Sequence, residues 1–287
     1  CLFLRLVIDS SLRNVSLFTM PAIIADIIKI MEDIAPSYLA EEWDNVGLQV
    51  GQKDWPVRNI RIALDPLPNV VAAACRERVD LLITHHPLIF KPLSSVDFST
   101  PVGAIINMAS KHKMAIFAAH TNLDNVTDGL NDILAYRIGL NNLKVLGDIR
   151  GPEDCQGLGR IGDLARKTKL GSFALEIKKK LGLNYIKVAG KPDLSVKKAA
   201  LCTGSGSSLI NNFFASGAQV YISGDFRYHD ARAAEAANLG IIDIGHFASE
   251  HLVVEIFAKR LREIISKTGI DVKVEACESE IDPFVVM

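Results

Sequence analysis

The chain has 287 residues, of which 49% are hydrophobic and 23% charged, and this composition excludes disordered, collagen-like and mucin-like classes. Lys and Arg (32) balance Asp and Glu (33), so the net charge of -1 gives no overall attraction to nucleic acid or anionic lipid, and neither is expected as a partner. Five scattered cysteines without a CxxC pair, and the absence of a long apolar run, favour a cytoplasmic protein without disulfides or a membrane span.

The first half of the chain alternates between helical and strand patterns. Residues 1–19 begin with Cys and lack a signal-peptide cleavage pattern, so we interpret them as a leader or an artefact that precedes a natural start at Met20. Apolar residues at helical spacing predict helices, and short apolar runs predict strands. The predicted helices cover 22–35, 68–78, 101–113 and 127–140, and the predicted strands cover 58–65, 80–86 and 114–119.

The second half resumes the same alternation after a Gly-rich stretch at 151–162, which indicates either a domain boundary or an excursion at a sheet edge. The predicted helices cover 173–183, 207–216, 229–240 and 246 to about 267, and the predicted strands cover 185–190, 197–204, 218–225, 241–246 and 271–276. This order predicts an α/β fold with two α/β domains and largely parallel or mixed sheets. We expect residues 20–130 plus 245–287 in the first domain and 131–244 in the second.

Histidines and carboxylates follow the predicted strands in both halves. Because ligands gather outside the carboxyl ends of strands in open α/β sheets, two such units that face each other form one cleft. His85 and His86 end one strand, and as neighbours in extended chain they point to opposite sides, so each suits a different ion of a closely spaced pair. His246 and Glu250 stand four apart at the start of a helix, within reach of a common ion.

His120 and Asp124 have the same spacing of four residues. Asn122 and Asn125 indicate a loop there, so Asp124 is preferred as a ligand, while His120 is expected to orient a ligand or move a proton. Nitrogen and oxygen donors without thiolate suit zinc, iron, manganese, cobalt or nickel. Two divalent ions about 3.5–4 Å apart lower the pKa of bound water, which favours hydrolysis.

Several motifs together resemble one known family. They are EEWDNVGL (41–48), ITHHPLIF (83–90), HTNLD (120–124), TGSG (203–206), SGDFRYHDA (223–231) and GHFASEH (245–251). From Met20 to Met287 the chain resembles the short form of the Nif three-like dinuclear-metal hexamers, the GTP cyclohydrolase 1 type 2 homologues. The resemblance implies a homohexameric toroid with two metal ions between the two domains of each subunit.

The resemblance also assigns individual ligands. It implies that His86 and Asp124 hold one metal, that His85 and His246 hold the other, and that Glu250 bridges the two. It further implies metal-dependent hydrolysis of a small nucleotide or heterocycle by metal-bound hydroxide. The alternative is a non-catalytic metal-binding toroidal assembly or interaction protein. An open coordination position with a pocket beside it would favour the hydrolase over the non-catalytic alternative, because structural metal sites are closed.

The remaining motifs allow more than one interpretation. EEWDNVGL is interpreted first as a structural turn and second as a part of the cleft lining. TGSG is a candidate anion nest before a helix. Asp225 and His229 follow a strand and are candidates for the substrate shell or for proton transfer, so His229 joins His120 as a catalytic candidate.

Overall fold

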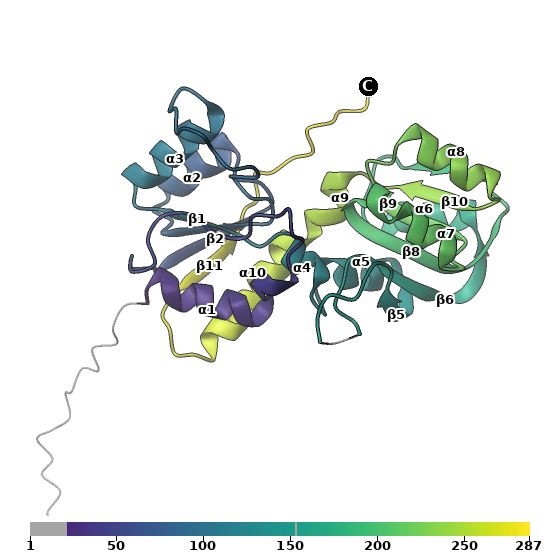
Figure 1. Cartoon of the computed structure of the whole chain (residues 1–287), viewed down its shortest axis with the longest axis horizontal. Coiled ribbons are helices and arrows are strands. Elements are labelled where there is room, and N and C mark those ends of the chain that lie inside the picture. The colour runs from purple at the N-terminus through teal and green to yellow at the C-terminus, as the bar shows by residue number, and fades with distance from the viewer. Residues whose placement is uncertain (1–21, 153) are drawn as a thin grey trace, which may run out of the picture.

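The computed structural model describes residues 22–152 and 154–287, which form two lobes (Figure 1). The expected leader at 1–19 lies outside these residues. Each lobe contains one β-sheet with helices on both faces, so the predicted α/β class with two sheets is confirmed. In the described part of the chain, no helix combines the length and the apolar character needed to cross a bilayer.

The first lobe contains a five-stranded sheet in the order β1-β4-β3-β2-β11, with β1 antiparallel and the other strands parallel. Its strands are β1 (Gly47–Val50), β2 (Asn59–Ala63), β3 (Leu81–Thr84), β4 (Ala115–Ala118) and β11 (Lys273–Ala276). All four residues of β3 and of β4 are buried, which explains their continuous apolar sequence. One sheet face packs against α1 (Ile24–Ile34) and α10 (Leu252–Ser266), and the other against α2 (Pro68–Arg76) and α3 (Pro101–Lys111).

The second lobe contains a six-stranded mixed sheet in the order β5-β6-β8-β9-β10-β7. Its strands are β5 (Leu140–Val145), β6 (Arg160–Lys169), β7 (Lys187–Ala189), β8 (Ser195–Ser205), β9 (Val220–Gly224) and β10 (Gly240–Asp243). The central strands β8, β9 and β10 are parallel to one another. One face packs against α5 (Leu130–Ile138) and α6 (Leu170–Lys180), and the other against α7 (Ile210–Ala215) and α8 (Tyr228–Ala236).

Several elements differ from the expected pattern. The described part of the Gly-rich stretch at 151–162 follows β5 and runs into β6, which begins at Arg160 and pairs antiparallel with β5, so the stretch is an excursion at a sheet edge and not a domain boundary. The strands β1, β5 and β6 were not predicted, because the partly exposed residues of β1 and β5 form no apolar run and the second half of β6 is mostly exposed. The predicted long helix from 246 consists of two helices, α9 (His246–Glu250) and α10.

The loop expected around Asn122 and Asn125 is wrong, because both residues lie in a short helix, α4 (Thr121–Asn125). Their side-chain amides are buried and donate to the backbone oxygens of Ala35 and Leu39, each at 2.7 Å. These amides therefore attach α4 to the segment after α1, and they do not form the local hydrogen bonds to neighbouring backbone that would make a turn. Tertiary hydrogen bonds have outweighed the local preference of asparagine for loops.

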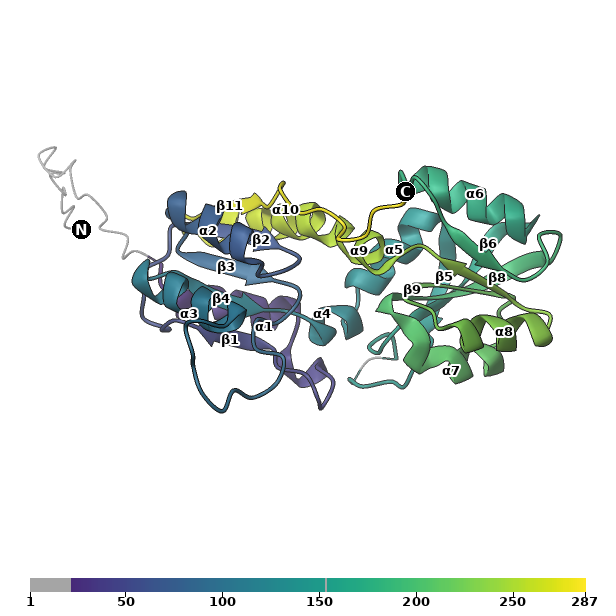
Figure 2. The same cartoon turned by 90° about the horizontal axis from the view of Figure 1, so that it is seen from above.

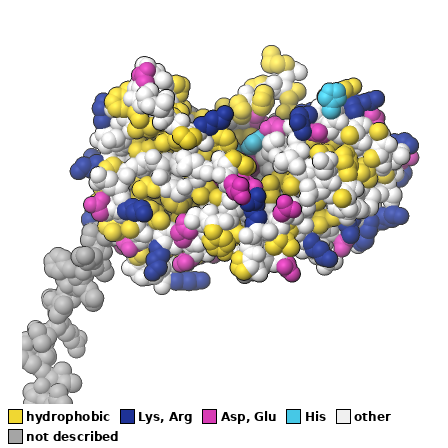
Figure 3. Space-filling model, viewed as in Figure 1, with side chains coloured by type: hydrophobic (Ala, Val, Ile, Leu, Met, Phe, Trp, Pro, Cys, Tyr) yellow, Lys and Arg dark blue, Asp and Glu magenta, His cyan; other side chains and the backbone are white. Residues whose placement is uncertain are grey.

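The carboxyl ends of the parallel strands in the two sheets approach one another between the lobes, where α4 and α9 lie (Figures 1 and 2). In the space-filling view the molecule is notched between the lobes, and a histidine is visible in the notch (Figure 3). Strand-end residues from both halves of the sequence therefore lie at one junction, as the pattern of histidines and carboxylates predicts.

A buried ion pair supports the second lobe beside this junction. Arg160 is 1% exposed, and its guanidinium donates to both carboxylate oxygens of Asp132, at 2.6 and 2.8 Å. The same guanidinium donates to the backbone oxygens of Val126, Gly157 and Gly159. These contacts connect β6 and the chain before it to the segment between α4 and α5.

Arg160→Met should destabilise the protein by about 3–5 kcal/mol, because it leaves the buried carboxylate of Asp132 without its counter-charge. The free energy of unfolding in urea measures this effect. Arg166→Met is the matched control, since Arg166 is exposed on the same strand and should change stability by less than about 0.5 kcal/mol. Equal effects of the two substitutions would contradict the role of the buried pair.

Candidate metal centre

Four imidazoles at the junction are each held by a hydrogen bond at Nδ1. The acceptors differ, but each bond fixes the ring and leaves Nε2 to face the other rings, a common arrangement for metal-binding histidines. The pairs are His85 with the backbone oxygen of Ala119 (3.0 Å), His86 with Asp65 (2.8 Å), His120 with Asp44 (2.9 Å) and His246 with Asp225 (2.8 Å).

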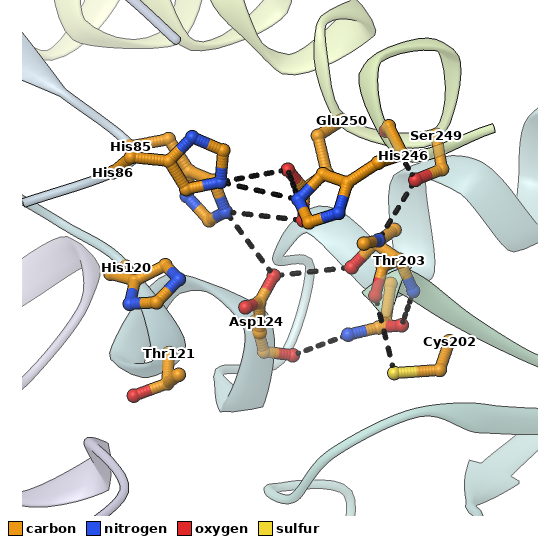
Figure 4. Close-up of polar contacts among 12 residues, drawn as sticks. His85, His86, His120, Thr121, Asp124, Cys202, Thr203, His246, Ser249 and Glu250 are labelled. Carbon is orange, nitrogen blue, oxygen red and sulfur yellow. Dashed lines mark hydrogen bonds and ion pairs between the residues drawn. The ribbon is translucent and has the colours of Figure 1, made fainter. Parts of the chain in front are cut away.

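The Nε2 atoms of three of these rings surround the carboxylate of Glu250 (Figure 4). Oε2 of Glu250 lies 3.0 Å from Nε2 of His86 and 3.0 Å from Nε2 of His246, and Oε1 lies 3.7 Å from Nε2 of His85. Oδ1 of Asp124 lies 3.9 Å from the same atom of His85. The structure therefore brings together all five residues that the sequence nominated as ligands.

The pairing of these residues differs from the one that the resemblance implies. His85 lies beside Asp124 of α4, while His86 lies beside His246 of α9, with 3.4 Å between the two Nε2 atoms. Contrary to the expectation for extended chain, the two neighbouring histidines do not point to opposite sides: their ring centroids lie 5.0 Å apart and both Nε2 atoms face Glu250. Glu250 lies between both groups, as expected of a bridging residue.

The donor set fits divalent cations. Nε2 of His85 is buried and has no hydrogen-bond partner among the described residues, and the buried Oε2 of Glu250 faces Nε2 of His86 and Nε2 of His246, each at 3.0 Å, which can donate to it only when protonated. Two groups of donors each lie within 4.8 Å of one another: His86, His246 and Glu250, and also His85, His86 and His120. Zinc, iron, manganese, cobalt or nickel could coordinate buried nitrogen and oxygen atoms at these separations.

The electrostatics of the metal-free cluster are dominated by Glu250. Burial alone would raise its pKa, but the surrounding imidazoles hold the pKa well below its usual range. In return, hydrogen bonds that the His86 ring donates to Asp65 and Glu250 outweigh burial and raise the pKa of His86 to about 10, and Glu250 raises the pKa of His246 to about 9. Burial raises the pKa of Asp124. Without metal, protons therefore hold the positions that cations would take.

The TGSG segment supports the two carboxylates. Oγ1 of Thr203 donates to Oδ1 of Asp124 at 3.2 Å, and the amide of Gly204 donates to Oγ of Ser249 at 2.8 Å. Gly204 has a positive φ of 64°, and a Cβ placed there would collide with Oε1 of Glu250. Because the amide of Gly204 is already bonded to Ser249, the segment supports the two carboxylates of the cluster and does not use that amide in an anion nest.

Two acidic residues are connected to the histidines although sequence analysis gave them no such role. Asp44, in the segment interpreted as a structural turn, accepts from the amide and the hydroxyl of Thr121 as well as from His120. Burial would raise the pKa of Asp44, but these bonds lower it to about 2. Asp65 follows the end of β2, so the rule that identified the histidines after β3 and β4 would have identified it too.

The structure does not bring His229 into the cluster. His229 is exposed near the start of α8, and its ring packs edge-on against that of Tyr228, with centroids 5.5 Å apart. The helix that begins at Tyr228 carries the side chain outward, whereas Asp225, three residues before the helix, bonds to His246. Asp225 therefore orients the ring of His246, whereas His229 lies outside the cluster.

Gly204→Ala should reduce the amount of bound metal, because the added methyl group displaces the carboxylate of Glu250. Elemental analysis of the purified protein measures this loss. Gly217→Ala is the matched control, since Gly217 also has a positive φ (75°) but nothing lies within 4 Å of its Cβ position. Both variants carry the backbone strain, so equal metal contents would mean that contact with Glu250 does not matter.

Metal affinity should increase with pH up to about 9–10, because a cation must displace the protons held by His86 and His246. The stability of the metal-free protein should instead decrease as pH rises. The raised pKa values stabilise the fold below the ordinary pKa of 6.5, and this stabilisation is lost as pH rises through about 9–10. Zinc competition against a chelator and urea unfolding at a series of pH values measure the two trends, and pH-independent affinity would contradict them.

Comparison with known proteins identifies the family of this chain. The family model of Duf34/NIF3 (NGG1p interacting factor 3) matches residues 22–283. A Clostridium perfringens protein named GTP cyclohydrolase 1 type 2 homolog is 35% identical over 260 residues, which are 90% of this chain and 97% of that protein. A Methanocaldococcus jannaschii protein of the same name is 37% identical over 247 residues, covering 84% of this chain and 93% of that protein.

A solved structure shows the same fold. The crystal structure of a Bacillus cereus protein related to NIF3 superposes with a TM-score of 0.86 at 28% identity, covering 93% of this chain and 99% of that one. The family match extends over almost all of the described residues and includes every clustered side chain. This chain is a member of the Duf34/NIF3 family.

Proposed function

We propose that this protein is a metal-dependent hydrolase that acts on a small nucleotide or heterocycle, with two divalent ions held by His85, His86, Asp124, His246 and Glu250. The observation that carries the proposal is the convergence of anchored imidazoles on one buried carboxylate, with Nε2 of His85 buried and without a hydrogen-bond partner among the described residues. The names of the relatives, GTP cyclohydrolase 1 type 2 homolog, support the same class of reaction.

Divalent ions at such a site would supply a Lewis acid and a water of lowered pKa. The chain itself supplies the group that moves protons. His120 is anchored at Nδ1 by the carboxylate of Asp44, and its other ligand atom lies within 4.8 Å of those of His85 and His86. An imidazole oriented by a carboxylate can accept a proton at Nε2 and return it, while the carboxylate stabilises the charged ring.

An adjoining cavity supports turnover over a purely structural role for the metal. A cavity of about 550 Å³ reaches His86 and His246, so one side of the cluster is open to a small molecule. Structural metal sites are closed by protein ligands, whereas catalytic sites leave a position open. The homohexamer and the cytoplasmic location that sequence analysis suggests remain predictions, and the mass of the native particle would test the first.

Glu250→Gln and His120→Ala should have different effects. Glu250→Gln removes the charge shared by both groups of imidazoles and should reduce bound metal well below two ions per chain. His120→Ala should leave the metal content nearly unchanged but lower the rate of hydrolysis by about 10²- to 10⁴-fold, the usual contribution of a positioned acid or base. Elemental analysis and a screen of GTP, its ring-opened analogues and phosphoesters measure the two effects.

The control is His112→Ala, because His112 is exposed at the end of α3 and should affect neither quantity. Loss of metal in His120→Ala would show that His120 is a ligand. Full metal content in Glu250→Gln would contradict the bridging role of Glu250. Stoichiometric metal without turnover of any compound in the screen would contradict the hydrolase and favour the non-catalytic alternative.

A further inference from the structure

The cavity beside the candidate metal centre is lined by several segments of the chain. It lies between the end of β2, the region of β7 and α9, and the C-terminal segment 282–286, and it reaches His86 and His246. Its volume of about 550 Å³ is within the range of pockets that bind small molecules. A ligand there would lie directly against the side of the cluster that does not contain His120.

The C-terminal wall is attached to the metal centre by a buried carboxylate. Glu280 is 7% exposed and accepts hydrogen bonds from the amides of Leu64 and Asp65, at 2.8–3.0 Å. Asp65 in turn holds Nδ1 of His86. The segment that follows Glu280 is therefore placed at the cavity by the same short stretch that orients one of the imidazoles.

The walls offer flat and apolar surfaces. Tyr185 precedes β7, Phe247 lies in α9, and Phe284 lies in the C-terminal segment, and all three line the cavity. Phe284 is 74% exposed and lines the same cavity as His86 and His246. Stacking on such side chains is favourable for any planar heteroaromatic ring.

The charged groups of the lining are already paired with one another. Asp65 and Asp225 bond to His86 and His246. Among the described residues that line the cavity, Lys187 is the only Lys or Arg, and its Nζ lies 2.8 Å from Oδ2 of Asp243. Asp282 adds a further carboxylate. Apart from the histidine cluster itself, the lining therefore contains four carboxylates and one lysine, which is already paired with Asp243.

We infer that this cavity binds an uncharged heteroaromatic ring of the nucleobase or nucleoside type, stacked against Phe284 and facing His86 and His246. This inference rests on the proposed function and narrows its substrate class, because it places the ring of the substrate in the cavity. The size of the cavity and its aromatic side chains favour a planar ring, and the four carboxylates and the paired lysine offer no separate site for a phosphate group away from the histidine cluster.

Calorimetric titration of the zinc-loaded full chain with guanosine and with GTP tests the inference. Guanosine should bind at least as tightly as GTP, and Phe284→Ala should weaken guanosine binding by about tenfold, the usual effect of losing one stacking surface. Phe98→Ala is the matched control, since Phe98 is also exposed (57%) but lies outside the cavity lining. A chain that ends at Ile281 keeps Glu280 and should reproduce the effect of Phe284→Ala.

Three results would overturn the inference. They are tighter binding of GTP than of guanosine that is lost in Lys187→Ala, guanosine binding that is unchanged in Phe284→Ala and in the shortened chain, and no binding of guanosine at all. The titration measures binding without turnover, so it is separate from the test of the proposed function. Guanosine binding that depends on Phe284, together with no hydrolysis of any compound, would support this cavity and contradict only the hydrolase.

Discussion

The buried carboxylate of Glu250 is the constraint on which the rest of the site depends. A charge that is 3% exposed is costly unless other charges or donors compensate it, and here three imidazoles do so, two from adjacent residues after β3 and one from the same helix as Glu250. Each of those rings needs its own acceptor at Nδ1, which brings in Asp65, Asp225 and a backbone oxygen. The space for the carboxylate in turn requires a glycine at position 204. One buried anion thus determines the residue types around it.

The topology explains how residues from both lobes reach one junction. Parallel strands place their carboxyl ends at one edge of a sheet, and the edges of the two sheets face the same junction. His85 and His86 follow β3, whereas His246 follows β10 of the other sheet. Loops at strand ends can vary in sequence without disturbing the buried strands. The sheets therefore form a rigid scaffold, and the segments at the junction carry the side chains of the candidate site.

The part of the site that could be predicted from sequence is the part encoded by local patterns. His246 and Glu250 share a helical spacing, and His85 and His86 end a buried strand, so both pairs were identifiable before the fold was known. The partners of each ring were not, because whether His85 meets Asp124 or His246 depends on how the two lobes pack. Asp44 is 76 residues away from His120, and no spacing rule connects them. The edge strands β1 and β5 were missed because pairing, and not an apolar run, defines them.

The division of the donors between the lobes has a mechanical consequence. His85, His86 and Asp124 come from one side of the junction, while His246 follows the last parallel strand of the other. A cation held by these residues would link the two lobes directly, and without it the lobes would be joined only by the covalent chain and by their packing. Binding of such a cation would therefore stabilise the arrangement of the two lobes as well as complete the site.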